Sequence, residues 1–170
     1  MTKTKALFGF AATIAALGSV SAAHAASGNT STAAGTASAT IVAPIVLTHT
    51  AAAALNFGKF TVGSGGTVVV NASGGGSVTG DVGFVPGSST TADAFTLTGD
   101  TTRNFSIATT NSTITNGSKT MSFTTTPSAT SATTSATGTY SFTVGGTLTV
   151  TGTETAGNYT GTYNATVQYQ

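Results

Sequence analysis

The clearest pattern along the chain is an alternation of apolar and polar residues, which predicts β-strands. It is cleanest over residues 159–169, where every second residue is Tyr, Gly, Ala or Val and those between are Thr, Asn or Gln. Period-two patterning with one polar side is typical of a half-buried antiparallel strand. Shorter strand-like runs occupy residues 56–62, 67–71, 77–85, 94–98 and 104–109.

Turn-forming residues separate these runs. The dipeptide Asn116-Gly117 predicts a hairpin between its flanking strands, and Gly145-Gly146 predicts a second hairpin within residues 139–151. Residues 128–137 are rich in Ser, Thr and Ala and are predicted to form a polar loop. With about eight to ten short strands, the pattern predicts an all-β, immunoglobulin-like two-sheet antiparallel sandwich.

The N-terminus has the features of an export signal. Lys3 and Lys5 precede an apolar stretch over residues 6–20, which is too short for a comfortable membrane span. Small residues surround a predicted cleavage site between Ala25 and Ala26. We therefore predict a signal peptide over residues 1–25 rather than a membrane anchor, and no membrane span after its removal.

The exported part divides into two regions. Residues 26–38 contain only Ala, Ser, Thr, Gly and Asn, and are predicted to be a flexible extension because they have no large apolar side chain to bury. From residue 39 to the C-terminus we predict the β-sandwich domain. Its first stretch, residues 39–48, is strand-like and apolar on both sides, and Pro44 favours an edge or a bulge there.

Composition excludes several kinds of protein. The chain has no cysteine, so it has no disulfide, thiolate metal site or cysteine-linked lipid. Charged residues make up 5 % of the chain, although 39 % of it is apolar. Beyond Ala25 there are only three basic residues, Lys59, Arg103 and Lys119, against four acidic ones. Binding to nucleic acid or to an anionic membrane surface needs clustered Lys and Arg, so neither is expected.

Catalytic groups are also scarce. Beyond the signal there is one histidine, His49, predicted to be exposed at a strand end, and four carboxylates: Asp81, Asp93, Asp100 and Glu154. A Ser-His-Asp triad, a pair of glycosidase carboxylates and a calcium site are the functional alternatives, but the turn-like surroundings of the carboxylates favour solvated turn residues. We expect no enzyme activity, no cofactor and no metal.

Three sequence blocks carry a family resemblance. They are Leu55-Asn56-Phe57-Gly58, Val144-Gly145-Gly146-Thr147-Leu148, and Gly157-Asn158-Tyr159-Thr160-Gly161-Thr162-Tyr163 followed by Val167-Gln168-Tyr169. From about residue 39 onward the chain resembles a family of secreted bacterial domains, domain of unknown function number 4402. That family is similar to fimbrial subunits (pilins) of chaperone–usher systems. Many pilins of the best-known class contain a disulfide, and this chain has none.

The pilin resemblance implies a mechanism. Such subunits resemble a sandwich that lacks one strand, which a periplasmic chaperone supplies first and the N-terminal segment of the next subunit replaces. The candidate donor residues are Ile41, Ala43, Ile45 and Leu47; the candidate chaperone contacts on the last strand are Gly157, Tyr163, Val167 and Tyr169. The alternative is that residues 41–47 form the first strand of the domain itself.

The resemblance therefore implies a structural subunit of a fimbria-like surface fibre with a role in adhesion or biofilm. We expect it to pass through the periplasm to the cell surface, with other copies of itself or related subunits, a chaperone and an outer-membrane usher as partners. The alternative is a self-contained secreted β-sandwich that acts as a surface or carbohydrate-binding protein. The lack of tryptophan and the predicted core positions of the tyrosines disfavour sugar binding.

Overall fold

The computed structural model describes residues 30–170, which form strands and turns and no helix. The predicted all-β antiparallel sandwich is confirmed. The predicted signal peptide and its cleavage site at Ala25 and Ala26 lie outside the described residues. The strands are β1 (Val46–His49), β2 (Phe60–Thr61), β3 (Gly66–Val70), β4 (Gly76–Gly80), β5 (Gly83–Phe84), β6 (Asp93–Thr98), β7 (Asn104–Thr109), β8 (Ser112–Asn116), β9 (Lys119–Pro127), β10 (Ser131–Thr133), β11 (Thr139–Val150) and β12 (Ala165–Tyr169).

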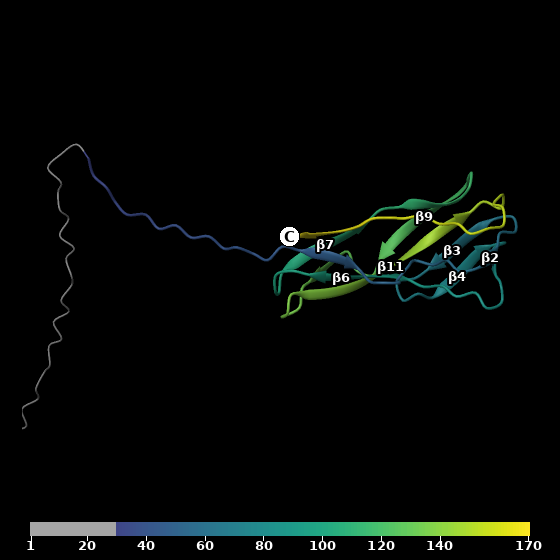
Figure 1. Ribbon diagram of the computed structural model, residues 1–170, viewed down its shortest axis with the longest axis horizontal. Helices are drawn as coiled ribbons and strands as arrows, with labels where there is room; N and C mark the ends of the chain where they lie inside the picture. The colour runs from purple at the N-terminus through teal and green to yellow at the C-terminus, as the bar shows by residue number, and fades with distance from the viewer. Residues whose placement is uncertain (1–29) are drawn as a thin grey trace, which may run out of the picture. The chain divides into compact units, whose positions relative to one another are not determined.

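Strand β11 organises the larger sheet (Figure 1). Its first half pairs with β6 and its second half with β3, while β9 pairs with its other edge around the middle. The result is a seven-stranded antiparallel sheet with the main order β1-β6-β11-β3-β4. Strand β9 also pairs with β11, and β8 pairs with β9. A two-stranded sheet of β2 and β5 lies apart from it.

The predicted hairpin at Gly145-Gly146 is wrong, because β11 runs straight through both residues. The two glycines are needed for close packing between strands. A Cβ on Gly145 would collide with the Val70 carbonyl oxygen of β3, and one on Gly146 with the Thr124 carbonyl oxygen of β9. Glycine here lets neighbouring backbones approach on both edges of the strand.

The second layer is a three-stranded sheet in the order β10-β7-β12. The chain passes between layers after β9, since β9 pairs with β11 in the large sheet and β10 pairs with β7 in the small one. The predicted polar loop over residues 128–137 therefore contains a short strand. The hairpin predicted at Asn116-Gly117 is confirmed, and Gly117 has the positive φ of 59° that its turn requires.

Two apolar clusters fill the molecule. Core 1 contains Phe57, Val68, Val70, Val82, Met121, Phe123, Leu148 and Val150. Core 2 contains Phe95, Leu97, Phe105, Ile107, Phe142 and Val144. Strand β11 contributes to both cores, because its inward side chains continue from Phe142 to Val150. Its outward positions, like those of β6 and β9, are Thr or Ser apart from Ala94 and Gly145.

The last strand is shorter than predicted. Alternation suggested a strand from residue 159, but β12 begins at Ala165. Upstream, the backbone pairs with β8 only through an isolated bridge between Thr115 and Thr160. In the part of the chain described here, no helix is long and apolar enough to cross a membrane.

Candidate binding groove

A groove with a volume of about 1180 Å³ opens over core 1. One side is residues 54–63, which we call the N-terminal wall, and the other is residues 154–161, which we call the C-terminal wall. Ile114, Met121 and Leu148, from β8, β9 and β11, lie between the walls. Side chains of the large sheet are therefore covered on this side by two segments that do not pair with each other, of which only the N-terminal wall contains a strand, the two-residue β2.

The N-terminal wall is anchored by the Leu55-Asn56-Phe57-Gly58 block. Phe57 is buried in core 1, with its ring edge-on to Phe123 at 5.9 Å between centroids. Asn56 pairs its backbone with Thr91 through two hydrogen bonds, and its side-chain oxygen accepts from the Gly58 N–H at 2.8 Å. Gly58 has a φ of 78°, a left-handed conformation that favours glycine. This wall is held firmly.

The C-terminal wall is held more weakly. Its backbone bonds to β8 through Thr160 alone, by N–H to carbonyl bonds of 2.8 and 3.0 Å with Thr115. Tyr159 packs against core 1, and its hydroxyl donates to the Thr155 carbonyl oxygen at 2.9 Å within the same wall. Gly161 permits close approach to β8, since a Cβ there would collide with the Thr113 carbonyl oxygen.

Glu154 shapes the turn that leads from β11 into the C-terminal wall. Its carboxylate accepts hydrogen bonds from the N–H and hydroxyl of Thr151 and from the N–H of Gly152, at 2.8–2.9 Å. Partial burial acts to raise the pKa of Glu154, but these hydrogen bonds outweigh it and leave the pKa below its ordinary value. The ionised side chain therefore stabilises this turn.

Both layers of the sandwich end in an edge strand near the chain termini. Among the described strands, β1 pairs with β6 alone and β12 with β7 alone. The Gln170 N–H bonds to Asn104, so the backbone groups of the alternate residues Ala165, Val167 and Tyr169 point to the free edge. A strand edge of this kind is a template for pairing with another chain.

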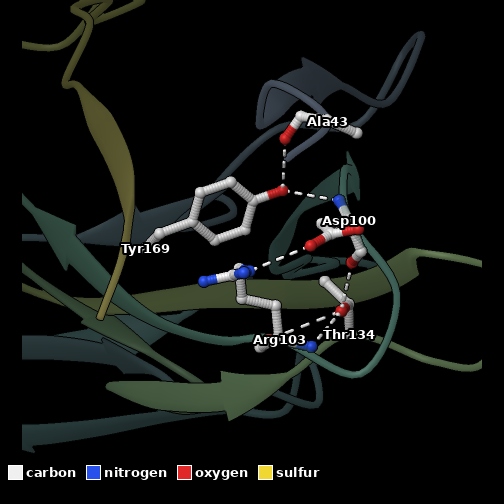
Figure 2. A network of polar contacts seen from close by, with 5 residues as sticks. All are labelled: Ala43, Asp100, Arg103, Thr134 and Tyr169. Atoms are coloured by element: carbon white, nitrogen blue, oxygen red, sulfur yellow. Dashed lines mark hydrogen bonds and ion pairs between the residues drawn. The ribbon is translucent and has the colours of Figure 1, made fainter. Parts of the chain in front are cut away.

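A polar network ties the two edges together at the end of β12 (Figure 2). The Tyr169 hydroxyl donates to the Ala43 carbonyl oxygen at 3.1 Å and accepts from the Asp100 N–H at 2.6 Å. Beneath it, Arg103 bonds the Asp100 carboxylate at 3.0 Å and lies 5.6 Å from the centre of the Tyr169 ring. Buried Thr134 donates to the Asp100 carbonyl oxygen. We call the Tyr169 contacts the latch.

Comparison with known families identifies the domain. Residues 47–169 match the family described as Domain of unknown function (DUF4402). The chain belongs to this family. The match to DUF4402 includes both walls of the groove and every strand apart from the first residue of β1. No curated protein and no solved structure matches the chain.

The candidate donor residues fall into two groups. Leu47 lies in β1 opposite Leu97, and both Leu47 and Ile45 pack against core 2 of the DUF4402 domain. Ile41 and Ala43 precede β1, and Ile41 is 96 % exposed. In this structure the residues of the second half of the candidate donor thus belong to the chain's own sandwich.

The candidate chaperone contacts are spread along the C-terminal segment. Gly157 lies in the C-terminal wall, where a Cβ would collide with the Asn116 side chain. Val167 and Tyr169 lie in β12 opposite Ile107 and Phe105 and pack against core 2. Tyr163 lies between these two regions and packs against both cores.

One pair of polar residues has a different role from the one predicted. Asp93 is not a solvated turn residue: it is 5 % exposed and lies at the start of β6. His49 is half-exposed at the end of β1, and its Nε2 lies 2.6 Å from the Asp93 carboxylate. The sequence does not indicate this pairing, because the partners are 44 residues apart. In the described part of the chain, no three His, Cys, Asp or Glu residues cluster as a metal site would require.

Proposed function

We propose that this DUF4402 protein is an exported structural subunit of a fimbria-like surface fibre, in which the segment before β1 of one copy fills the groove of another. The observation that carries the proposal is the groove itself, whose C-terminal wall bonds its backbone to β8 through Thr160 alone. An extended segment placed beside this wall would add the backbone pairing that it lacks.

The segment before β1 has the pattern of such a strand. Over residues 33–43, every second residue is Ala, Gly or Ile, and those between are mainly Thr or Ser. This alternation is typical of a strand with one buried side, yet residues 30–44 form no strand and are all exposed. The segment therefore has a side suited to burial, and a second copy offers a surface to bury it against.

The segment is long enough to form a strand, since residues 33–43 correspond to roughly 36 Å of extended chain at about 3.3 Å per residue. Burying the four alanine methyl groups at about 0.8 kcal/mol each and Ile41 at about 1.5–3 kcal/mol contributes about 5–6 kcal/mol. Each new backbone hydrogen bond adds about 1 kcal/mol net. Small side chains suffice because several weak contacts act together with the backbone.

A matched pair of substitutions tests the segment. Ala37→Asp places a carboxylate on the apolar side of the alternation, and Thr36→Asp places one on the hydroxyl side. We expect Ala37→Asp to abolish assembly of the purified protein, as followed by electron microscopy and size-exclusion chromatography, and Thr36→Asp to leave it intact. Deleting residues 26–40 should also block assembly while the domain stays folded. Fibres of normal length from the deletion or from Ala37→Asp would refute the assignment.

Assembly in the cell would require the partners that the pilin resemblance implies, a periplasmic chaperone and an outer-membrane usher. The free edge of β12 is the surface that we propose for the chaperone. Tyr169→Ser, at the end of that strand, should lower the amount of protein in the periplasm if the chaperone protects it. Unchanged periplasmic levels would argue against this partner.

The decisive experiment is negative-stain electron microscopy of the producing cells with and without the gene. Loss of thin surface fibres in the mutant, restored by the intact gene, would support the proposal. Unchanged fibres together with monomeric protein would refute it. The protein would then be better described as a self-contained secreted β-sandwich at the surface, with the groove as the first place to look for a carbohydrate.

A further inference from the structure

Asp93 has an unusual position for a carboxylate in this domain. It is buried, and it accepts hydrogen bonds from three parts of the chain. His49 Nε2 on β1 lies 2.6 Å away, the Ala94 N–H of β6 donates at 2.8 Å, and the Tyr163 hydroxyl donates at 2.8 Å. The carboxylate thus joins β1 and β6 of the larger sheet to Tyr163 of the C-terminal segment through side chains.

The side chain of Tyr163 is held in place by packing against both cores. Its ring is edge-on to Phe95 of core 2 at 6.3 Å and to Phe123 of core 1 at 6.2 Å between centroids. Burial, together with the hydrogen bond to Asp93 and its charge, raises the pKa of Tyr163 above its ordinary value. The hydroxyl therefore stays protonated and continues to donate to the carboxylate.

The backbone on the two sides of Tyr163 is held very differently. On the C-terminal side, β12 forms a five-residue ladder with β7. On the N-terminal side, the C-terminal wall has the single bridge between Thr115 and Thr160. Segments with few backbone bonds open locally at lower free energy than segments in a ladder. Tyr163 thus lies at the boundary between a firmly held strand and a weakly held wall.

We propose that Tyr163 is a hinge about which the C-terminal wall opens to admit a strand while β12 keeps its pairing. The hydrogen bond from the Tyr163 hydroxyl to the Asp93 carboxylate holds this hinge in place. The admission of a strand rests on the proposed function, whereas the opening of the wall does not. His49 is a positioning residue in this account, because it acts by fixing the Asp93 carboxylate, which in turn holds the Tyr163 hydroxyl. His49 and Tyr163 are the titratable side chains within hydrogen-bond distance of Asp93.

The test uses amide hydrogen exchange in the C-terminal wall, read at the Thr160 N–H, which donates to the Thr115 carbonyl oxygen of β8, in the purified protein, with Tyr163→Phe as the main variant. Phenylalanine keeps the ring between the cores and removes the donor. Because hydrogen bonds to a charged group are among the stronger ones, we expect exchange in the wall to accelerate about tenfold or more, with exchange in β12 changed much less. The matched control is Tyr140→Phe, whose ring packs against Phe105 in core 2.

The hinge would be overturned if amide exchange in the C-terminal wall has the same rate in the wild type and in Tyr163→Phe. It would also be overturned if Tyr163→Phe accelerates amide exchange in the wall and in β12 by the same factor. If Tyr163→Phe does not fold, His49→Gln at the half-exposed side of Asp93 should accelerate exchange at the same amide to a smaller extent. A synthetic peptide of residues 30–43 tests the function separately. If amide exchange in the C-terminal wall is faster in a variant but neither the wild type nor the variants bind the peptide, the hinge is supported and the fibre is rejected. If the peptide binds but amide exchange in the wall is unchanged in the variants, the fibre is supported and the hinge is rejected.

Discussion

The latch at Tyr169 can be tested quantitatively with two substitutions at positions that are far apart in the sequence. Tyr169→Phe removes the hydroxyl that bonds Ala43 and Asp100. Gly99→Ala acts from the other side, because a Cβ on Gly99 would occupy the position of that hydroxyl. Gly99 does not have a positive φ, so alanine meets no backbone strain there. Each substitution should therefore break the same two hydrogen bonds.

The expected magnitudes follow from these contacts. Two hydrogen bonds at about 1 kcal/mol net each predict that either single variant loses about 2 kcal/mol of unfolding free energy. The double variant should also lose about 2 kcal/mol rather than about 4, which corresponds to a coupling energy of about 2 kcal/mol. Residues in direct contact commonly show couplings of this size, whereas independent sites add.

The assay is equilibrium unfolding in urea followed by circular dichroism, which does not depend on the fluorescence of the altered tyrosine. Gly83→Ala is the control, because its added methyl group would meet only the Thr61 hydroxyl oxygen, at 3.4 Å; it should change stability by less than about 0.5 kcal/mol. Additive losses in the double variant would show that Gly99 and Tyr169 act independently and would refute the latch.

Three further predictions concern the fold. Leu148→Ala removes a fully buried side chain of core 1 and should cost about 3–5 kcal/mol in urea unfolding; a loss below about 1 kcal/mol would contradict its place in the core. Gly146→Ala should cost about 1–3 kcal/mol, because the methyl group forces β9 away from β11, and wild-type stability would show that the strands are not so close. Because the pKa of Glu154 is below its ordinary 4.5, its stabilising effect is present above that pH and is lost as the pH falls through the folded value. Glu154→Gln should therefore be less stable than the wild type near neutral pH, with the difference shrinking in acid; a constant difference would contradict this assignment.

Local signals predicted part of the fold correctly. The Asn116-Gly117 hairpin was predictable because a turn that needs a positive φ selects glycine, and Gly117 has that conformation. The runs at β6 and β7 were predictable because one side of each is buried. The hairpin predicted at Gly145-Gly146 was wrong because a glycine pair that permits close strand packing looks the same in sequence as a glycine pair that forms a turn. Only the neighbours Val70 and Thr124 distinguish the two.

Less of the candidate site than of the fold could be predicted from the sequence. A buried Asp93 paired with His49 depends on the register of β1 with β6, which no local pattern specifies. The groove likewise depends on where pairing stops, and the alternation over residues 159–164 predicts pairing that β8 provides only at Thr115. The alternation before β1 is present in the sequence, but its apolar positions are mostly Ala and Gly, which give only a weak strand signal.

The threonine and serine face of β6, β9 and β11 has a consequence for how the molecule responds to its surroundings. Apart from Ala94 and Gly145, its outward positions carry hydroxyl groups, and none of them carries an ionisable group, so they have no charge for salt to screen or for acid and alkali to change. Whatever this face touches, the attraction rests on hydration and on short-range contacts. Contacts made through this face should therefore keep the same strength as the ionic strength changes, whereas contacts made through a charged surface would weaken as salt is added.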